Sequence, residues 1–204
     1  MFTKLDYDFY SQPDVVKLAR LLIGKVLVTK WKGIETSGRI VETEAYKGET
    51  DKASHAWNGR RTARTEIMYG DAGSAYVYLC YGIHHLFNVV TNSKDTPHAI
   101  LVRAIEPLTG IDTMLQRTGK KKNDLTLGSG PGNVSKALGL FTKHSGINLL
   151  DDEVFIVDDG FVPKKGSVIA TPRIGVAYAG EDALLPYRFI LKNNLHLSAK
   201  RHNA

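Results

Sequence analysis

The sequence predicts an α+β protein whose strands pair in an antiparallel sheet. Strand patterns gather early in the chain, at 25–31, 34–46, 75–81, 86–91 and 99–106. Two helical patterns follow, at 109–117 and 131–140, and strand patterns return at 154–157, 174–177 and 188–191. The turns between the early strands, such as Lys32-Gly33, are short and therefore favour antiparallel pairing. Because strands and helices do not alternate strictly, this order is α+β and not a βαβ series.

A first helix is expected between Ser11 and Gly24, which are a start and a stop signal around Pro13. The apolar residues of this segment recur at helical spacing: Val15, Leu18, Ala19 and Leu22. A second helix start is expected at 127–132, LGSGPG, capped by Ser129. The alternative for this glycine-rich turn is a phosphate cradle at the helix amides.

Length and composition restrict the class of protein. A chain of 204 residues with 43% hydrophobic residues can form a continuous core, so we expect 1–204 to be one domain, with a mobile basic tail at 199–204. The single cysteine, Cys80, excludes an intramolecular disulfide and indicates a reducing, cytoplasmic compartment. No signal-peptide pattern precedes the first helix, and no apolar run approaches the roughly 20 residues that span a bilayer. We therefore expect no contact with a membrane.

Charge and missing motifs bear on partners and cofactors. The chain has 27 Lys and Arg against 21 Asp and Glu, a net charge of +6 that weakly favours a polyanionic partner. No dinucleotide fingerprint and no phosphate-binding loop is present, so no nucleotide cofactor is expected. The histidine and cysteine spacings of metal sites are also missing, which predicts no metal and no other cofactor. Without a heptad pattern, a monomer is expected.

Residues 38–46, GRIVETEAY, carry two acids within one predicted strand. A period of two puts Ile40, Glu42, Glu44 and Tyr46 on one face. At about 3.3 Å per residue, the backbone positions of the two acids lie about 7 Å apart, near the separation of paired acids in glycoside hydrolases. The segment alone favours the alternative that both acids pair with arginine or lysine on an exposed sheet face.

A cationic loop follows this strand. Three arginines, Arg60, Arg61 and Arg64, come shortly after His55, although such clusters are usually only solvated. Carboxylates and a histidine near a basic loop can also hold Mg²⁺ or Mn²⁺. A metal-dependent nuclease is therefore an alternative, and it would use Glu42, Glu44, Asp51 and His55.

Residues 75–82, AYVYLCYG, form an aromatic strand that ends at a turn. Tyr76 and Tyr78 share one face, where a packing ladder is the ordinary interpretation. Tyr81 has the other parity and stands beside Gly82, and a ring protruding there has the shape of a wedge that enters a base stack. A second alternative is thus a non-catalytic nucleic-acid-binding module in which tyrosines stack on bases.

Several blocks in order resemble one family. ETEAY, His55, YVYLCYG, Asn88, LVRAIEP, GPGNVSKALG and RIGVAYAGE resemble the alkyladenine DNA glycosylases, also called 3-methyladenine DNA glycosylases, from about Gln12 to about Phe189. Many specific blocks in the right order are much harder to obtain by chance than one motif. The resemblance implies a single mixed domain with a curved antiparallel sheet, a protruding β-hairpin, peripheral helices and no helix-hairpin-helix.

The resemblance also implies an activity. It is that of a monofunctional DNA glycosylase of base excision repair, which flips alkylated or deaminated purines out of double-stranded DNA and hydrolyses the N-glycosidic bond, leaving an abasic site. The damaged purines that it releases would be 3-methyladenine, 7-methylguanine, hypoxanthine and ethenoadenine. The enzyme would act in the bacterial cytoplasm, at the nucleoid.

Roles in this family carry over to matching positions. Glu44 matches the water-activating acid and Arg103 an arginine of the water and phosphate network. Tyr46, His55 and Tyr78 match the base-stacking pocket. Asn88 matches an asparagine that discriminates against guanine, and Tyr81 matches the residue that intercalates in DNA. No residue matches a catalytic lysine.

The chain departs from the family pattern near the hairpin and the cationic loop. Ile83, His84 and His85 follow the Tyr-Gly turn, where a methionine is frequent, and Thr65 follows Arg64, where asparagine is expected. The connection 92–98 is also longer than expected. These departures affect the expected loop and groove contacts. No residue is identified that protonates a neutral leaving base, although Glu42 is a candidate helper.

Overall fold

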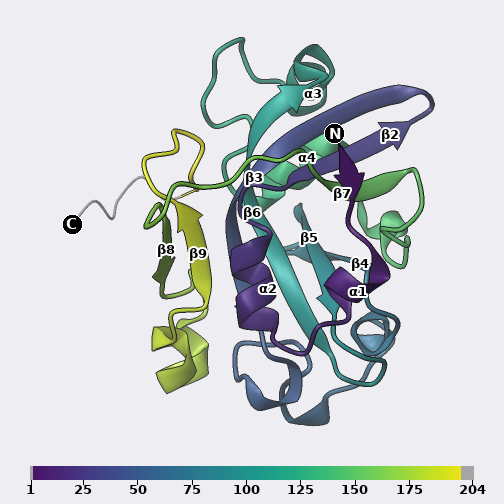
Figure 1. Ribbon diagram of the computed structural model, residues 1–204. Coiled ribbons are helices and arrows are strands. Elements are labelled where there is room, and N and C mark those ends of the chain that lie inside the picture. Colours follow the sequence, from purple (N-terminus) through teal and green to yellow (C-terminus); the bar gives the residue numbers. More distant parts are fainter. Residues whose placement is uncertain (1, 199–204) are drawn as a thin grey trace.

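A computed structural model of the protein describes residues 2–198, and the tail predicted at 199–204 lies outside the described residues. The described part forms a large antiparallel sheet with few helices, which confirms the α+β prediction (Figure 1). The strands are β1 (Thr3–Lys4), β2 (Val26–Trp31), β3 (Ile34–Tyr46), β4 (Ala75–Cys80), β5 (His84–Thr91), β6 (His98–Thr109), β7 (Val154–Asp158), β8 (Val168–Thr171) and β9 (Arg188–Leu191). That the whole chain forms one domain stays a prediction.

The long strand β3 organises the sheet. The strand order is β1-β7-β2-β3-β6-β5-β4, and β8 and β9 join it because β9 pairs with β3. β3 is long enough to pair with β2, β6 and β9, and it bends along its length (Figure 1). β9 is thereby brought beside Glu42 and Glu44, in the C-terminal half of β3.

The helices are short and lie around the sheet. They are α1 (Tyr7–Tyr10), α2 (Val15–Leu21), α3 (Ile111–Thr118) and α4 (Pro131–Leu138), with 3₁₀ turns η1 (Gly48–Thr50), η2 (Trp57–Gly59), η3 (Glu66–Tyr69), η4 (Thr142–His144) and η5 (Ala177–Leu184). α2 packs on β3 and β6, and α4 packs on β5 and β6. No helix within residues 2–198 has the length and apolar composition needed to cross a membrane.

Strand alternation separates a core face from a face that we call the site face. The core face carries Ala45 on β3, Phe87 on β5 and Val102 on β6, which belong to one buried cluster with α2 and α4. The neighbours of these residues in sequence point the other way. Glu44, Tyr46, Tyr76, Tyr78, Asn88 and Arg103 accordingly share the site face.

A β-bulge corrects one expectation about β3. Ile40 was expected to share a face with Glu42, but the register shifts between these two residues, and Ile40 belongs to the core cluster that contains Ala45. An extra residue in one strand changes the parity of the side chains beyond it. A second shift follows directly between Glu42 and Thr43 and lies opposite Arg103. The two bulges aim Ile40 into the core and Arg103 at the acids.

Two expected helix starts differ from the structure. α2 begins after Asp14, whose carboxylate accepts a hydrogen bond from Lys17 N, and not after Ser11. α4 begins after Gly130 without a side-chain cap, because Ser129 is used elsewhere: its hydroxyl donates to the carbonyl of Leu197. Long-range bonding to the C-terminal segment has replaced the expected local cap.

The strand predicted at 174–177 is wrong, and β8 lies at Val168–Thr171 instead. The backbone of Ile174 does not join the ladder, because its N–H donates to Glu44 Oε1 at 2.7 Å. Gly175 then turns the chain with φ +78° into η5. A segment that resembles a strand in sequence thus supplies a backbone donor to the site face.

Candidate active site

A pocket of about 330 Å³, its open mouth included, lies on the site face. The lining residues are Tyr46, Ala53, Ser54, His55, Met68, Tyr76, Tyr78, Asn88, Ala99 and Tyr178. All four residues predicted to contact a base are among them: Tyr46, His55, Tyr78 and Asn88. Four tyrosines and a histidine are among these residues, so the pocket suits a flat group that can stack on aromatic rings and form hydrogen bonds.

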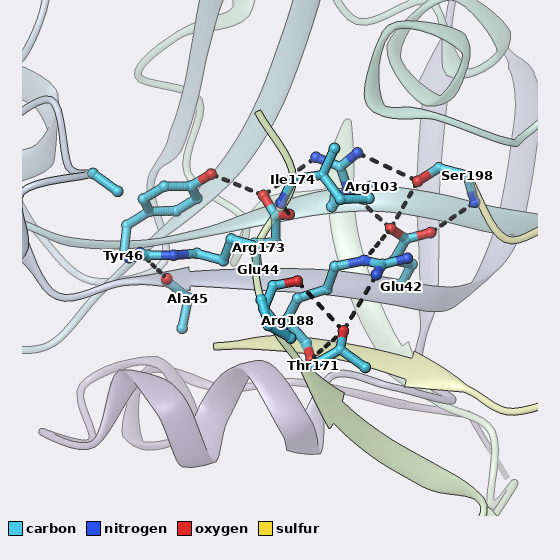
Figure 2. A network of polar contacts seen from close by, with 12 residues as sticks. Glu42, Glu44, Ala45, Tyr46, Arg103, Thr171, Arg173, Ile174, Arg188 and Ser198 are labelled. Atoms are coloured by element: carbon cyan, nitrogen blue, oxygen red, sulfur yellow. Dashed lines mark hydrogen bonds and ion pairs between the residues drawn. The ribbon is translucent and has the colours of Figure 1, made fainter. Parts of the chain in front are cut away.

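Glu44 lies behind this pocket and is fully buried, with 0% of its surface exposed. Its Oε2 accepts hydrogen bonds from the Tyr46 hydroxyl at 2.8 Å and from Arg103 Nη1 at 3.2 Å, and its Oε1 accepts one from Ile174 N (Figure 2). Burial and then the charge of Glu44 raise the pKa of Tyr46 well above its ordinary value, so the phenol stays a donor. Tyr46 is the link between the pocket and the acid.

The two acids of β3 differ in how fully they are bonded. A carboxylate has about four acceptor sites. Glu42 receives four donors: Arg103 Nε, Arg188 Nε and the N–H and hydroxyl of Ser198. Glu44 receives three, which leaves one acceptor site on Oε1. Glu44 can therefore accept a further hydrogen bond on Oε1, whereas three of the four donors to Glu42 meet on its Oε1 and only Ser198 N reaches its Oε2.

Glu42 is an ionised structural acid. Burial opposes its ionisation, but the charges of Arg103 and Arg188, with the two bonds from Ser198, hold the pKa of this carboxyl below its ordinary value. A carboxylate in this state carries no proton to donate. The suggestion that Glu42 helps to protonate a leaving group is therefore not supported by its environment.

A buried ion pair supports the pocket from behind. The Arg173 guanidinium lies 4.9 Å from the centroid of the Tyr46 ring and donates to Asp51 Oδ1 at 2.8 Å and to the carbonyl of Ala45 at 2.9 Å. The side chains of Arg173 and Asp51 are 0% and 1% exposed. Asp51 in turn accepts from the N–H groups of the loop that carries His55. This pair fixes Tyr46 and the loop together.

His55 is held against two tyrosines. Its Nδ1 is 2.9 Å from the Tyr76 hydroxyl, and its ring meets the Tyr78 ring edge-on with centroids 4.6 Å apart. Burial, with the charges of Arg64 and Arg60, lowers the pKa of His55 to about 4. The imidazole is therefore neutral at pH 7.

This shift predicts a pH-dependent stability. The unfolded chain binds a proton on His55 near pH 6.5, whereas the folded chain binds it only near pH 4. Stability is therefore lost as the pH falls through this window, by about 3 kcal/mol from this group. Urea unfolding at pH 7 and at pH 4.5 measures the loss, and His55→Gln should reduce it. An equal loss in the native and variant chains would contradict the assignment.

Asn88 is a fixed wall of the pocket. It is 3% exposed, and its side-chain amide donates to the carbonyls of Tyr76 at 3.0 Å and Leu86 at 3.2 Å. Both N–H bonds are thus committed to backbone, so the side chain cannot rotate without losing them. The amide keeps its orientation whatever enters the pocket.

Tyr81 stands apart from the pocket, at the tip of the β4–β5 hairpin. It is 90% exposed and has φ +51°, followed by Gly82 with φ +73°, and Cys80 accepts a hydrogen bond from Ile83 N across the turn. Two residues of positive φ suit a tight hairpin turn, but a bulky side chain is strained there. The turn holds the ring in solvent at a conformational cost.

The departures near the hairpin have structural roles. His85 Nδ1 accepts from Thr142 N at 3.2 Å, and its ring meets Phe141 edge-on at 5.2 Å. His84 lies against Gly132 of α4, where a Cβ would come within 2.9 Å of its Nδ1. Thr65 is buried and its hydroxyl donates to the carbonyl of Arg60. These residues brace the hairpin and the cationic loop.

The acids and histidine considered for a metal site do not come together. Among residues 2–198, no group of three or more His, Cys, Asp or Glu side chains could hold a metal ion. The carboxylates of Glu42 and Asp51 are instead paired with arginines. Glu44 also pairs with Arg103, so three of the four proposed ligands of the nuclease alternative are already bonded to arginines.

Sequence reasoning missed several residues of the site. Tyr76 was placed on the correct face by alternation but was assigned to packing, although its hydroxyl bonds to His55. Arg173 lies within the RIGVAYAGE block, which gave a position but no partner. For Ser198 and Arg188 no signal was present, because only the fold brings them to Glu42.

Comparisons with known proteins agree with this arrangement. The profile of the methylpurine-DNA glycosylase family matches residues 8–195. A Chlamydia felis protein, provisionally named 3-methyladenine DNA glycosylase, is 47% identical over 92% of this chain and 95% of its own length. Proteins with the same provisional name from Clostridium perfringens and Bacillus cereus are 40% and 42% identical, over 97% and 94% of this chain and 100% and 97% of theirs. The resemblance is confirmed: the chain belongs to the methylpurine-DNA glycosylase family and is a DNA repair glycosylase, a hydrolase that acts on N-glycosidic bonds of DNA.

Proposed function

We propose that this glycosylase flips an alkylated or deaminated purine out of duplex DNA and hydrolyses its N-glycosidic bond with a water directed by Glu44. The observation that carries the proposal is a fully buried carboxylate, with one free acceptor site, beside an aromatic pocket. A base inside a duplex is out of reach of such a pocket, so it must first be rotated out at a cost of a few kcal/mol.

The pocket lining accounts for selection of damaged purines. Electron-poor alkylated purines stack well on aromatic rings, and cationic ones are also attracted to the negative ring faces of Tyr46 and Tyr78. His55 is neutral, so it offers an N–H without repelling a cationic base. Asn88, which is held by two backbone carbonyls, cannot move aside for the exocyclic amine of guanine. Hypoxanthine, ethenoadenine, 3-methyladenine and 7-methylguanine are the proposed substrates.

Glu44 acts when the base leaves. The glycosidic electron pair departs with the base, which leaves positive charge on the sugar, and the buried carboxylate stabilises that charge. Water then adds to C1′ and gives its proton to Glu44. Arg103 fixes the carboxylate through Oε2, and the free site on Oε1 is where the water would bond.

The product is proposed to be an uncut abasic site. A lyase needs an amine to form a Schiff base with the sugar, and none of the lining residues of the pocket is a lysine. Trapping with borohydride should therefore leave enzyme and DNA unlinked. Stoichiometric crosslinking would contradict the monofunctional assignment. The protein is proposed to act as a monomer, because one hairpin and one pocket suffice for one lesion.

Tyr81 is proposed to fill the gap left by the flipped nucleotide. Replacing it with glycine removes the ring and relieves the strained φ, so we expect binding of lesion DNA to weaken about 10- to 100-fold, the worth of one stacking contact, while the folded state keeps its stability. Binding titrations and thermal unfolding of Tyr81→Gly measure the two effects. Unchanged binding by this variant would remove Tyr81 from the intercalating role.

The experiment that tests the proposal is release of bases from matched duplexes in EDTA. Each duplex carries hypoxanthine, ethenoadenine or 7-methylguanine at one position, and controls carry adenine or guanine there. We expect release of the damaged bases only, at rates that EDTA does not change. Tight binding without release would favour the non-catalytic reader, and loss of release in EDTA would favour a metal-dependent mechanism.

A further inference from the structure

Glu42, an acid to which the proposed reaction gives no role, lies at the centre of a buried polar network. It is 0% exposed, although a lone buried carboxylate is costly. Arg103 and Arg188 donate to its Oε1 at 2.9 and 2.8 Å, and Ser198 donates through its hydroxyl to Oε1 and through its N–H to Oε2, both at 2.7 Å (Figure 2). Four donors therefore hold this acid, three of them on Oε1.

Arg103 is shared between the two acids of β3. Its Nε donates to Glu42, its Nη1 donates to Glu44 Oε2, and its Nη2 donates to the Ser198 hydroxyl at 3.3 Å. Each nitrogen of the guanidinium therefore has its own partner. An arginine with one acidic neighbour tends to form a two-pronged pair with it. Here the Nε–H of Arg103 is bonded to Glu42, so that a single N–H of the guanidinium reaches Glu44.

The C-terminal segment 192–198 completes this arrangement. Its Asn194 amide donates to Glu106 at 2.9 Å, and the Leu197 carbonyl accepts from the Ser129 hydroxyl at 2.9 Å. These bonds fix the segment across β6 and the start of α4. Ser198, at the end of the segment, then contacts both Glu42 and Arg103.

We propose that Glu42, which Ser198 holds in place, is a positioning residue for hydrolysis of the glycosidic bond. It binds one N–H of Arg103, so that a single N–H of this arginine reaches Glu44 and one acceptor site of Glu44 stays free for water. Without the negative charge of Glu42, the Arg103 guanidinium turns toward Glu44 and covers its oxygens with a second N–H. The acid then stays buried but has no site left for the water. This inference rests on the proposed role of Glu44.

The test is a double-mutant cycle between Glu42→Gln and Arg103→Met, followed by single-turnover release of ethenoadenine. We expect Glu42→Gln to slow release about 10- to 100-fold, as loss of a partner that orients a reacting group commonly does. On the Arg103→Met background it should slow release less than twofold further, because it acts through that arginine. The DNA concentration for half-saturation and the fluorescence change of ethenoadenine on flipping should stay within twofold of native.

Two controls separate positioning from general damage to the fold. Asp159→Asn breaks another arginine–carboxylate pair, with Arg39, whose side chain otherwise contacts the Gly24 carbonyl and the Phe161 ring and no member of the Glu42 network. This variant should leave release unchanged. Ser198→Ala removes the hydroxyl that donates to Glu42 and accepts from Arg103 but keeps the backbone N–H bond to Glu42. We expect release about 3- to 10-fold slower with flipping unchanged, a smaller loss than that of Glu42→Gln. If Glu42→Gln does not fold, Ser198→Ala and its double-mutant cycle with Arg103→Met test the positioning role instead.

The outcomes are distinct from those of the proposed function. Release by the native chain tests that function, whereas the inference is tested by ratios to the native rate. Multiplicative effects of Glu42→Gln and Arg103→Met would overturn the inference, as would an unchanged rate in Glu42→Gln or in Ser198→Ala. A parallel loss of flipping and release would also overturn it, because a positioning residue of the chemical step leaves flipping intact.

Discussion

Replacing Glu44 with glutamine should slow release of ethenoadenine about 10²- to 10⁴-fold, the usual contribution of general acid–base catalysis. Glutamine keeps the shape of the side chain but cannot take a proton from water or balance positive charge on the sugar. In glutamine one of the two carboxylate oxygens becomes an NH₂ group. This group would face donors, because Tyr46, Arg103 and Ile174 all donate to the carboxylate oxygens. The reaction is followed by single-turnover kinetics with enzyme in excess.

The same variant should still bind and flip the lesion, because Tyr46, Tyr78 and Tyr81 are unchanged. Fluorescence of ethenoadenine reports flipping in the same reaction. Glu35→Gln is the matched control, since Glu35 is exposed and pairs with Lys30 at the β2–β3 hairpin. If the Glu44 variant retained the native release rate, another group would have to direct the water.

Replacing Arg173 with methionine should destabilise the fold by about 3–5 kcal/mol, the cost of leaving one member of a buried ion pair without its partner. Asp51 is 2% exposed, and its side chain would remain buried among backbone N–H groups with its main countercharge gone. Tyr46 would also lose the cation behind its ring. Urea unfolding at pH 7 measures the change in free energy.

An exposed arginine provides the comparison. Arg61 also forms two ion pairs, with Glu66 and Asp95, but its side chain is 44% exposed. Water replaces such contacts readily, so Arg61→Met should change the unfolding free energy much less. Equal destabilisation by the two variants would mean that burial of the Arg173 pair is not what stabilises this region.

Local patterns were enough to predict most strands and the face that carries the site. β3 was predicted from end to end, because its residues alternate and a Lys32-Gly33 turn with positive φ precedes it. Alternation alone put Tyr76 and Tyr78 together, and their rings are stacked at 5.4 Å. Such features depend on residues near one another in sequence, which a single sequence records.

Features that depend on distant partners could not be predicted in this way. The bulges around Glu42 arise from pairing of β3 with β6, so they reverse the expected direction of Ile40. The backbone of Ile174 left the expected strand because an acid 130 residues earlier binds its N–H. Ser198 contacts Glu42 across 156 residues. Nothing local in the sequence marks these contacts, since they exist only after the chain has folded.

The most direct test of the account is the product that the native chain and Glu44→Gln form from one ethenoadenine duplex in EDTA. The DNA is analysed twice, once directly and once after heating in alkali, which cuts the strand only at abasic sites. We expect strand cleavage only in DNA that was treated with the native chain and then heated in alkali. Cleavage without alkali, or equal cleavage with both chains, would contradict hydrolysis directed by Glu44.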